Sequence, residues 1–90
     1  MLEGSVKVVN ALGLHARAAA QLVRLAGRYR STIILRRDDT GAFANAKSIL
    51  SVLPLAAPFG TELMFEVDGD DEREASDAIS DIFAKGFGEF

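Results

Sequence analysis

Four short segments of the chain carry the apolar patterns that are typical of β-strands. A valine-rich run at residues 6–9 indicates a first strand, which the following Asn-Ala-Leu-Gly sequence ends. Residues 31–36 and 42–44 predict two further strands, and the Asp-Asp-Thr-Gly turn between them favours a hairpin. In residues 61–67, leucine, phenylalanine and valine alternate with glutamate and methionine, as expected for a strand with one buried face.

Two helices are predicted between these strands. In residues 16–28 the apolar side chains recur at intervals of three and four along one face, while arginines occupy another face. A shorter helix is expected to begin at or near Ser48, because serine is a good N-cap residue. It should end at Leu53, because Pro54 disfavours helical geometry in the residue before it.

A last helix is predicted after Asp71, which forms with Glu74 a pattern that resembles a capping box. Its apolar stripe consists of Ala75, Ala78, Ile79 and Ile82. Lys85 and Gly86 provide a cationic C-terminal turn and a stop signal.

The order of these elements, βαββαβα, predicts one α+β domain over residues 1–90. We expect an open-faced sandwich of two layers, with a four-stranded antiparallel sheet and three helices on one of its faces. A right-handed crossover would place the first and fourth strands side by side, as in a split βαβ unit.

The composition excludes several classes of site. The 90 residues include no cysteine and one histidine, so disulfides, thiolate nucleophiles and cysteine-based metal sites are excluded, and we expect no metal and no cofactor. No apolar run approaches the ~18–20 residues of a membrane span, and the N-terminus lacks the apolar region of a signal peptide. The expectation is a cytoplasmic monomer with no membrane partner.

The net charge of −3 hides an asymmetry between the two halves of the chain. Residues 1–50 carry eight Lys or Arg and three acids, or +5, while residues 51–90 carry two bases and ten acids, or −8. The basic half indicates an anionic partner. The overall acidity and the single tyrosine argue against nucleic acid as that partner, so a small ligand- or nucleic-acid-binding module is the least favoured interpretation.

The only histidine, His15, lies between a glycine-containing loop and the first turn of the first predicted helix. The unpaired amides of that turn, at Ala16, Arg17 and Ala18, combine with the helix dipole to form an anion site. The same environment disfavours an imidazolium, which leaves a neutral ring with a nucleophilic nitrogen. The Arg17 guanidinium is suited to phosphate oxygens. These groups together could accept and hold a phosphoryl group.

A lone histidine at a helix start more often acts only as a cap or as a partly exposed side chain, and most surface arginines are simply solvated. No carboxylate pair or nucleophilic triad is evident near His15, so hydrolase chemistry has no support.

The sequence Gly-Leu-His-Ala-Arg at residues 13–17 resembles the active-site motif of the HPr family, the histidine-phosphorylated carriers of the bacterial phosphotransferase system. Residues 45–50, Asn-Ala-Lys-Ser-Ile-Leu, resemble the family's second motif, around a regulatory serine. Residues 68–72, Asp-Gly-Asp-Asp-Glu, followed by a helix with an apolar stripe, resemble its C-terminal third. The resemblance covers nearly all of the chain, and the family's order of elements is the one predicted above.

The resemblance implies a phosphocarrier that receives a phosphoryl group from enzyme I and passes it to an enzyme IIA protein. His15 would carry the group on Nδ1 and Arg17 would stabilise it. Ser48 would match the serine that an HPr kinase/phosphorylase modifies in some lineages. The partner-binding residues implied by the family, together with the basic residues expected to steer acidic partners, are Arg24, Arg28, Lys47, Ile49, Leu50 and Leu53.

An alternative is a regulatory binding module of the same fold, which acts through the Ser48 face and relays no phosphate.

The chain departs from the family pattern at two positions. Ala18 replaces a common proline, which adds an amide near the site, and Leu12 replaces an asparagine that is frequent in the sugar branch. Residues 9–14 and 82–87 look more like the nitrogen-related branch of the family.

Overall fold

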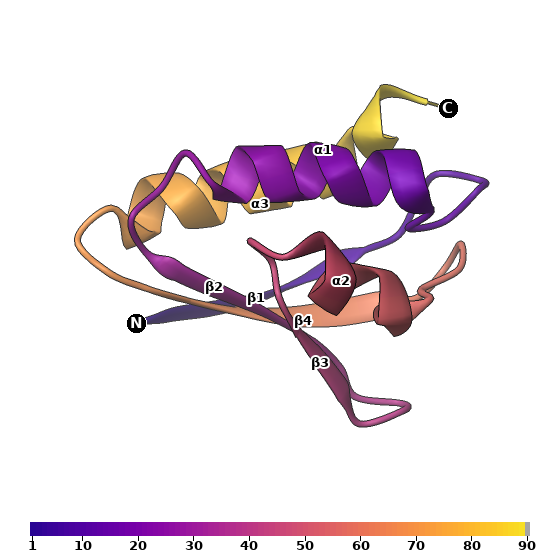
Figure 1. The fold of residues 1–90 in the computed structure, drawn as a ribbon, viewed down its shortest axis with the longest axis horizontal. Coiled ribbons are helices and arrows are strands. Elements are labelled where there is room, and N and C mark those ends of the chain that lie inside the picture. Colours follow the sequence, from indigo (N-terminus) through magenta and orange to yellow (C-terminus); the bar gives the residue numbers. More distant parts are fainter. Residues whose placement is uncertain (90) are drawn as a thin grey trace.

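The computed structural model of the chain describes residues 1–89 and has the element order predicted from the sequence (Figure 1). The strands are β1 (Leu2–Lys7), β2 (Thr32–Arg37), β3 (Ala42–Asn45) and β4 (Glu62–Asp68). The α-helices are α1 (Ala16–Ala26), α2 (Ile49–Val52) and α3 (Glu72–Ala84), and the 3-10 turns are η1 (Leu53–Leu55) and η2 (Gly86–Gly88). The predicted α+β class is confirmed.

The four strands form one antiparallel sheet in the order β1-β4-β2-β3. β1 lies beside β4, and β2 forms a hairpin with β3, as predicted. In β4 the residues Leu63, Phe65 and Val67 are buried and alternate with more exposed ones, which confirms the one-sided pattern. Figure 1 shows α1 and α3 next to each other over this face. The opposite face exposes side chains such as Phe43, which is 73% exposed.

The core between the sheet and the helices differs from the prediction at α3. Ile79 is fully buried, as expected, but Ala78 and Ile82 are only half-buried. Phe83, in the last turn of α3, is buried instead. Its ring packs edge-to-face on Phe87, with the ring centroids 5.0 Å apart and the planes at 71°. The C-terminal segment therefore helps to close this end of the core, a contact that helical periodicity does not reveal.

Several element boundaries also differ from the predicted ones: β1 covers Leu2–Lys7 rather than residues 6–9, and α1 ends at Ala26 rather than at residue 28. β1 begins at Leu2, before the valine run, because pairing with β4 holds a Leu-Glu-Gly-Ser segment extended although glycine and glutamate have low strand propensity. α2 ends at Val52, which is buried in the core, and the chain then continues as η1 through Pro54. Proline is accepted there because the first residues of a helical turn need no amide hydrogen.

Asp71 is the N-cap residue of α3, but its side chain makes no capping bond, so the predicted capping box with Glu74 is wrong. The carboxylate instead accepts hydrogen bonds from the amides of Arg30 (2.8 Å) and Ser31 (2.9 Å) and from the Ser31 hydroxyl. These bonds hold the connection between α1 and β2 against the start of α3. The Ser31 hydroxyl, followed by the Arg30 amide, lowers the pKa of Asp71 to about 2.

We expect the substitution Asp71→Asn to lower the free energy of unfolding at neutral pH. This loss should be smaller in acid. The pKa of Asp71 in the folded protein is about 2, below the ordinary value of 3.8. The carboxylate therefore stabilises the fold fully above pH 3.8, and this stabilisation is lost as the pH falls through about 2. Urea unfolding from neutral pH to about pH 2 measures this difference. Asp70→Asn, at an exposed neighbour, is the control. If the wild type remains more stable than Asp71→Asn by the same free energy at the lowest pH, the ionised Asp71 carboxylate is not the source of the stabilisation.

Candidate functional site

His15 is the N-cap residue of α1, and its ring lies over the first turn of that helix. The backbone of His15 is extended (φ −78°, ψ −179°), and its carbonyl accepts a helical hydrogen bond from the Ala19 amide at 2.8 Å. Ring Nδ1 accepts a hydrogen bond from the Arg17 amide at 3.3 Å, and the side chain is 25% exposed. The ring therefore borders the open amino end of α1, where the amides of Ala16, Arg17 and Ala18 precede the regular ladder.

The loop before α1 holds His15 at this position. Gly13 has a positive φ of 72°, and a Cβ there would lie 2.7 Å from the carbonyl oxygen of Ala57. The Leu14 amide donates to the same oxygen at 2.8 Å, and the Gly13 amide donates to the Asn10 carbonyl at 3.1 Å. The loop thus lies directly against the segment before β4, and only a glycine fits the closest approach.

Glu89 completes the surroundings of the ring. Its Oε1 lies 2.6 Å from His15 Nε2 and accepts a hydrogen bond from Asn10 Nδ2 at 2.7 Å. Asn10 is fully buried, and its Nδ2 also donates to the Gly13 carbonyl at 2.7 Å. The hydrogen bonds from Asn10 and then from His15 lower the pKa of Glu89, so its carboxylate is ionised at neutral pH.

Neither Asn10 nor Glu89 is predicted as a site residue from the sequence. Glu89 lies 74 residues from His15 along the chain, beyond the helix stop, and a single acid in a tail indicates no particular location. The one usable signal is the pair of glycines before it, at positions 86 and 88, because glycine is typical of tight turns and helix ends. Asn10 has no signal beyond its place in the loop that ends the first predicted strand.

The arginines predicted to bind phosphate and partners lie at the surface, two of them on α1 (Ala16–Ala26) and Arg28 just after it. Arg17, Arg24 and Arg28 are all exposed. After the hydrogen bonds from Asn10 and His15, the positive charge of Arg17 makes a smaller contribution to the low pKa of Glu89. The backbone amide of Arg17 lies 3.3 Å from His15 Nδ1, and the role of the Arg17 guanidinium stays a prediction.

The residues predicted on the short helix divide into two groups. Leu50 is 80% exposed and Leu53 is 38% exposed, whereas Ile49 is half-buried and packs against the core. The exposed apolar patch is therefore made of Leu50 and Leu53, and Ile49 supports it from below. Because α2 packs beside α1, this patch belongs to the part of the surface that adjoins α1.

Ser48 and Lys47 precede α2 and differ in their contacts. Ser48 is the N-cap residue, as predicted, but its hydroxyl makes no capping bond. The Lys47 ammonium donates to the Tyr29 carbonyl at 2.7 Å, just after the end of α1. Lys47 thus links the segment before α2 to the segment after α1, so its ammonium group makes a contact within the domain.

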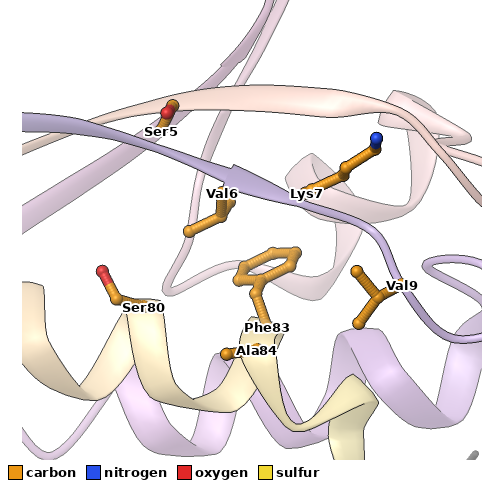
Figure 2. A pocket seen from close by; sticks show the side chains of 7 residues that line it. All are labelled: Ser5, Val6, Lys7, Val9, Ser80, Phe83 and Ala84. Atoms are coloured by element: carbon orange, nitrogen blue, oxygen red, sulfur yellow. The ribbon is translucent and has the colours of Figure 1, made fainter.

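The hollow drawn in Figure 2 lies between β1 and α3 and does not include the His15 site. Val6 points toward Phe83, while Ser5 and Lys7 point to the other side of β1 (Figure 2). The walls of the hollow are mainly apolar, and the Ser80 hydroxyl is a polar group among them.

No set of three His, Cys, Asp or Glu side chains within residues 1–89 is arranged to hold a metal ion. In the same range, every helix is too short or too polar to cross a membrane.

Comparison with known proteins gives a consistent assignment. A family model described as "PTS HPr component phosphorylation site" matches residues 2–85. The phosphocarrier protein HPr of Cupriavidus necator is 45% identical over 99% of this chain and 98% of its own length. The phosphocarrier protein NPr of Proteus mirabilis is 40% identical over 93% of this chain and 92% of its own length. The crystal structure of HPr-C-His from Thermoanaerobacter tengcongensis matches with a TM-score of 0.93 at 37% identity, over 100% of this chain and 99% of its own.

The substitution Gly13→Ala should destabilise the fold more than Gly41→Ala, which is a matched control. Both glycines have a positive φ, 72° and 77°, but a Cβ at Gly41 meets nothing within 4 Å. Gly41→Ala should therefore cost only the left-handed conformation, about 1–2 kcal/mol. Gly13→Ala adds the overlap with Ala57 and should cost about 3 kcal/mol or more. Urea unfolding measures both, and equal losses would show that the loop does not depend on this close approach.

Proposed function

The chain belongs to the HPr family of the bacterial phosphotransferase system, and we propose that it relays a phosphoryl group through His15. The donor is the phosphohistidine of enzyme I, and the acceptor is a histidine of an enzyme IIA protein. The observation that carries this proposal is the position of His15 Nδ1, which lies 3.3 Å from the Arg17 amide at the open end of α1.

The chemistry follows from this position. The Nδ1 lone pair attacks the donor's phosphorus, the new Nδ1–P bond forms, and the donor imidazole leaves with the electron pair of its own N–P bond. Such a transfer needs positioning and charge stabilisation more than acid–base groups. The amides of Ala16, Arg17 and Ala18 and the Arg17 guanidinium supply positive charge for the phosphoryl oxygens. At 3.3 Å the Arg17 amide bonds Nδ1 only weakly, so it can turn to a phosphoryl oxygen.

Transfer between two proteins also needs a surface that both can approach in turn. The exposed Arg17 and Arg24 attract acidic faces, and the exposed Leu50 and Leu53 offer apolar contact area on the neighbouring α2. Enzyme I and enzyme IIA proteins would use the same surface. We infer a cytoplasmic monomer that carries the group and acts on no small-molecule substrate. The relatives carry both HPr and NPr names, so the nitrogen-related branch stays a prediction.

Ser48 supports an added layer of control by an HPr kinase/phosphorylase. Its hydroxyl is not engaged in capping, and it lies two residues before the exposed Leu50. A phosphate there would add about two negative charges next to the apolar patch and would repel acidic partners. The alternative function, a binding module without phosphate relay, would use this same face. The arrangement around His15 Nδ1 favours the relay.

The decisive experiment is phosphorylation by a matched enzyme I and phosphoenolpyruvate. The wild type should gain one phosphate that is labile in acid and stable in base, and His15→Ala should gain none. Mass spectrometry detects the group, and NMR of the phosphorylated ring identifies Nδ1 as its site. Label that persists in His15→Ala would overturn the proposal. Label on Ser48 from ATP and a kinase, with none on His15 from enzyme I, would favour the binding module.

The role of the α2 patch is tested by comparing Leu50→Ala with Phe43→Ala. Both side chains are highly exposed, at 80% and 73%, but Phe43 lies on the face of the sheet away from the helices. Truncation of a side chain that docks a partner costs more than about 1 kcal/mol, or roughly fivefold to tenfold in binding. We expect that rise in the KM for the Leu50→Ala protein in the enzyme I reaction and almost none for Phe43→Ala. Equal effects would place docking elsewhere.

A further inference from the structure

We propose that Glu89 is a positioning residue for His15: its carboxylate keeps the hydrogen on Nε2 and places a negative charge beside the ring that carries the phosphoryl group. This inference rests on the proposed relay through His15. It concerns a side chain of the C-terminal segment, which lies beyond the residues 2–85 matched by the family model.

The hydrogen bonds at the two ring nitrogens determine the tautomer. Nδ1 lies opposite the Arg17 amide, which can only donate, so Nδ1 must present its lone pair. Nε2 lies 2.6 Å from the Glu89 carboxylate, which can only accept, so Nε2 carries the hydrogen. The nitrogen that must attack phosphorus is thereby left unprotonated.

Asn10 fixes the carboxylate in this position. Both partners of Asn10 Nδ2 are acceptors, the Gly13 carbonyl and Glu89 Oε1, so the amide cannot be flipped. Asn10 is fully buried, which leaves its side chain no other orientation that satisfies these groups. The buried side-chain amide of Asn10 thus links the loop before His15 to Glu89.

The C-terminal segment brings Glu89 to the ring by an ordered path. Phe87 is buried against Phe83 although its φ is positive, 56°, and Gly86 and Gly88 on either side also have positive φ values. The amide of Glu89 donates to the Gly86 carbonyl at 3.1 Å. Figure 1 shows this segment rising beside the end of α1 at which the helix begins. Left-handed backbone at a buried phenylalanine is unfavourable, and the aromatic packing maintains it.

The cluster around the ring holds more acceptors than donors. Among residues 1–89, Asn10 Oδ1 and Glu89 Oε2 are buried and have no hydrogen-bond partner. Such unpaired acceptors reduce stability, and the Glu89 carboxylate places a negative charge beside Nε2. Among residues 1–89, Glu89 from the C-terminal segment contacts the His15 ring and Arg17 of α1 lies two residues from it, while the loop at residues 10–14 has no charged side chain.

This charge matters most after phosphorylation. Once Nδ1 has used its lone pair to bind phosphorus, the ring is cationic for as long as Nε2 keeps its proton. A carboxylate bonded to Nε2 favours that protonated form, in which the imidazole is the better leaving group for the next transfer. No proton is gained or lost in the step itself, since the Nε2 proton stays between the ring and Glu89 throughout.

The test compares Glu89→Gln with Asp77→Asn, which removes an exposed carboxylate of α3 as a matched control. Each protein is phosphorylated by enzyme I, and NMR follows the pH at which the phosphorylated ring loses its Nε2 proton. We expect this midpoint to fall by about one pH unit in Glu89→Gln, a change of about tenfold in the protonation equilibrium. Asp77→Asn should leave it within a few tenths of a unit of the wild type. Equal midpoints in all three proteins would overturn the proposal, because a merely structural Glu89 would not move this titration.

The unphosphorylated proteins separate this inference from the proposed function. NMR of the His15 ring nitrogens reports the bond between Nε2 and the carboxylate without any phosphate. If the wild type accepts no phosphoryl group but its Nε2 signal changes in Glu89→Gln, the relay is wrong and the Glu89–His15 contact holds. If the wild type is phosphorylated and neither signal depends on Glu89, the relay holds and the positioning role is wrong.

Discussion

Burial of one face of the sheet beneath α1 and α3 is the constraint on which the rest of the structure depends. β4 lies between β1 and β2, and its alternate residues all face the helices. With α1 laid along this face, the amino end of the helix opens at the surface, and the chain from β1 must turn sharply to reach it. The close contact of Gly13 with Ala57 makes that turn, and His15 follows it directly.

The two nitrogens of His15 are held by opposite ends of the chain. Nδ1 faces an amide of the helix that His15 itself begins, and Nε2 faces a carboxylate from the C-terminal segment. The first contact is local and the second depends on Phe87, which packs on Phe83 within the core. The ring is thus oriented by the fold as a whole, at a site that also retains two buried acceptors without partners among residues 1–89. Departures from full hydrogen-bond satisfaction are expected where function rather than stability selects the residues.

The charge asymmetry of the chain has a structural counterpart. Arginines of the basic half, Arg17 and Arg24, are exposed on α1. Several acids of the other half accept internal hydrogen bonds: Asp71 from the α1–β2 connection, Glu72 from the Gly69 amide, and Glu89 from Asn10 and His15. The hollow between β1 and α3 is mostly apolar and lies apart from the histidine. A shallow surface site of this kind suits a group that passes between two proteins better than it suits a small substrate that must be enclosed.

The order of the elements, the β2–β3 hairpin, the alternation in β4 and the position of His15 at a helix start were all determined by the sequence, because periodicity, turn residues and caps act over only a few residues. The start of β1, the partners of Asp71, the burial of Phe83 and the contact of Glu89 with His15 were decided only by the tertiary structure. Each of these depends on a strand, loop or tail that is distant along the chain. Local sequence patterns do not determine which distant residue makes the contact. The sequence alone therefore places His15 at the start of a helix, while the fold decides which groups contact its ring.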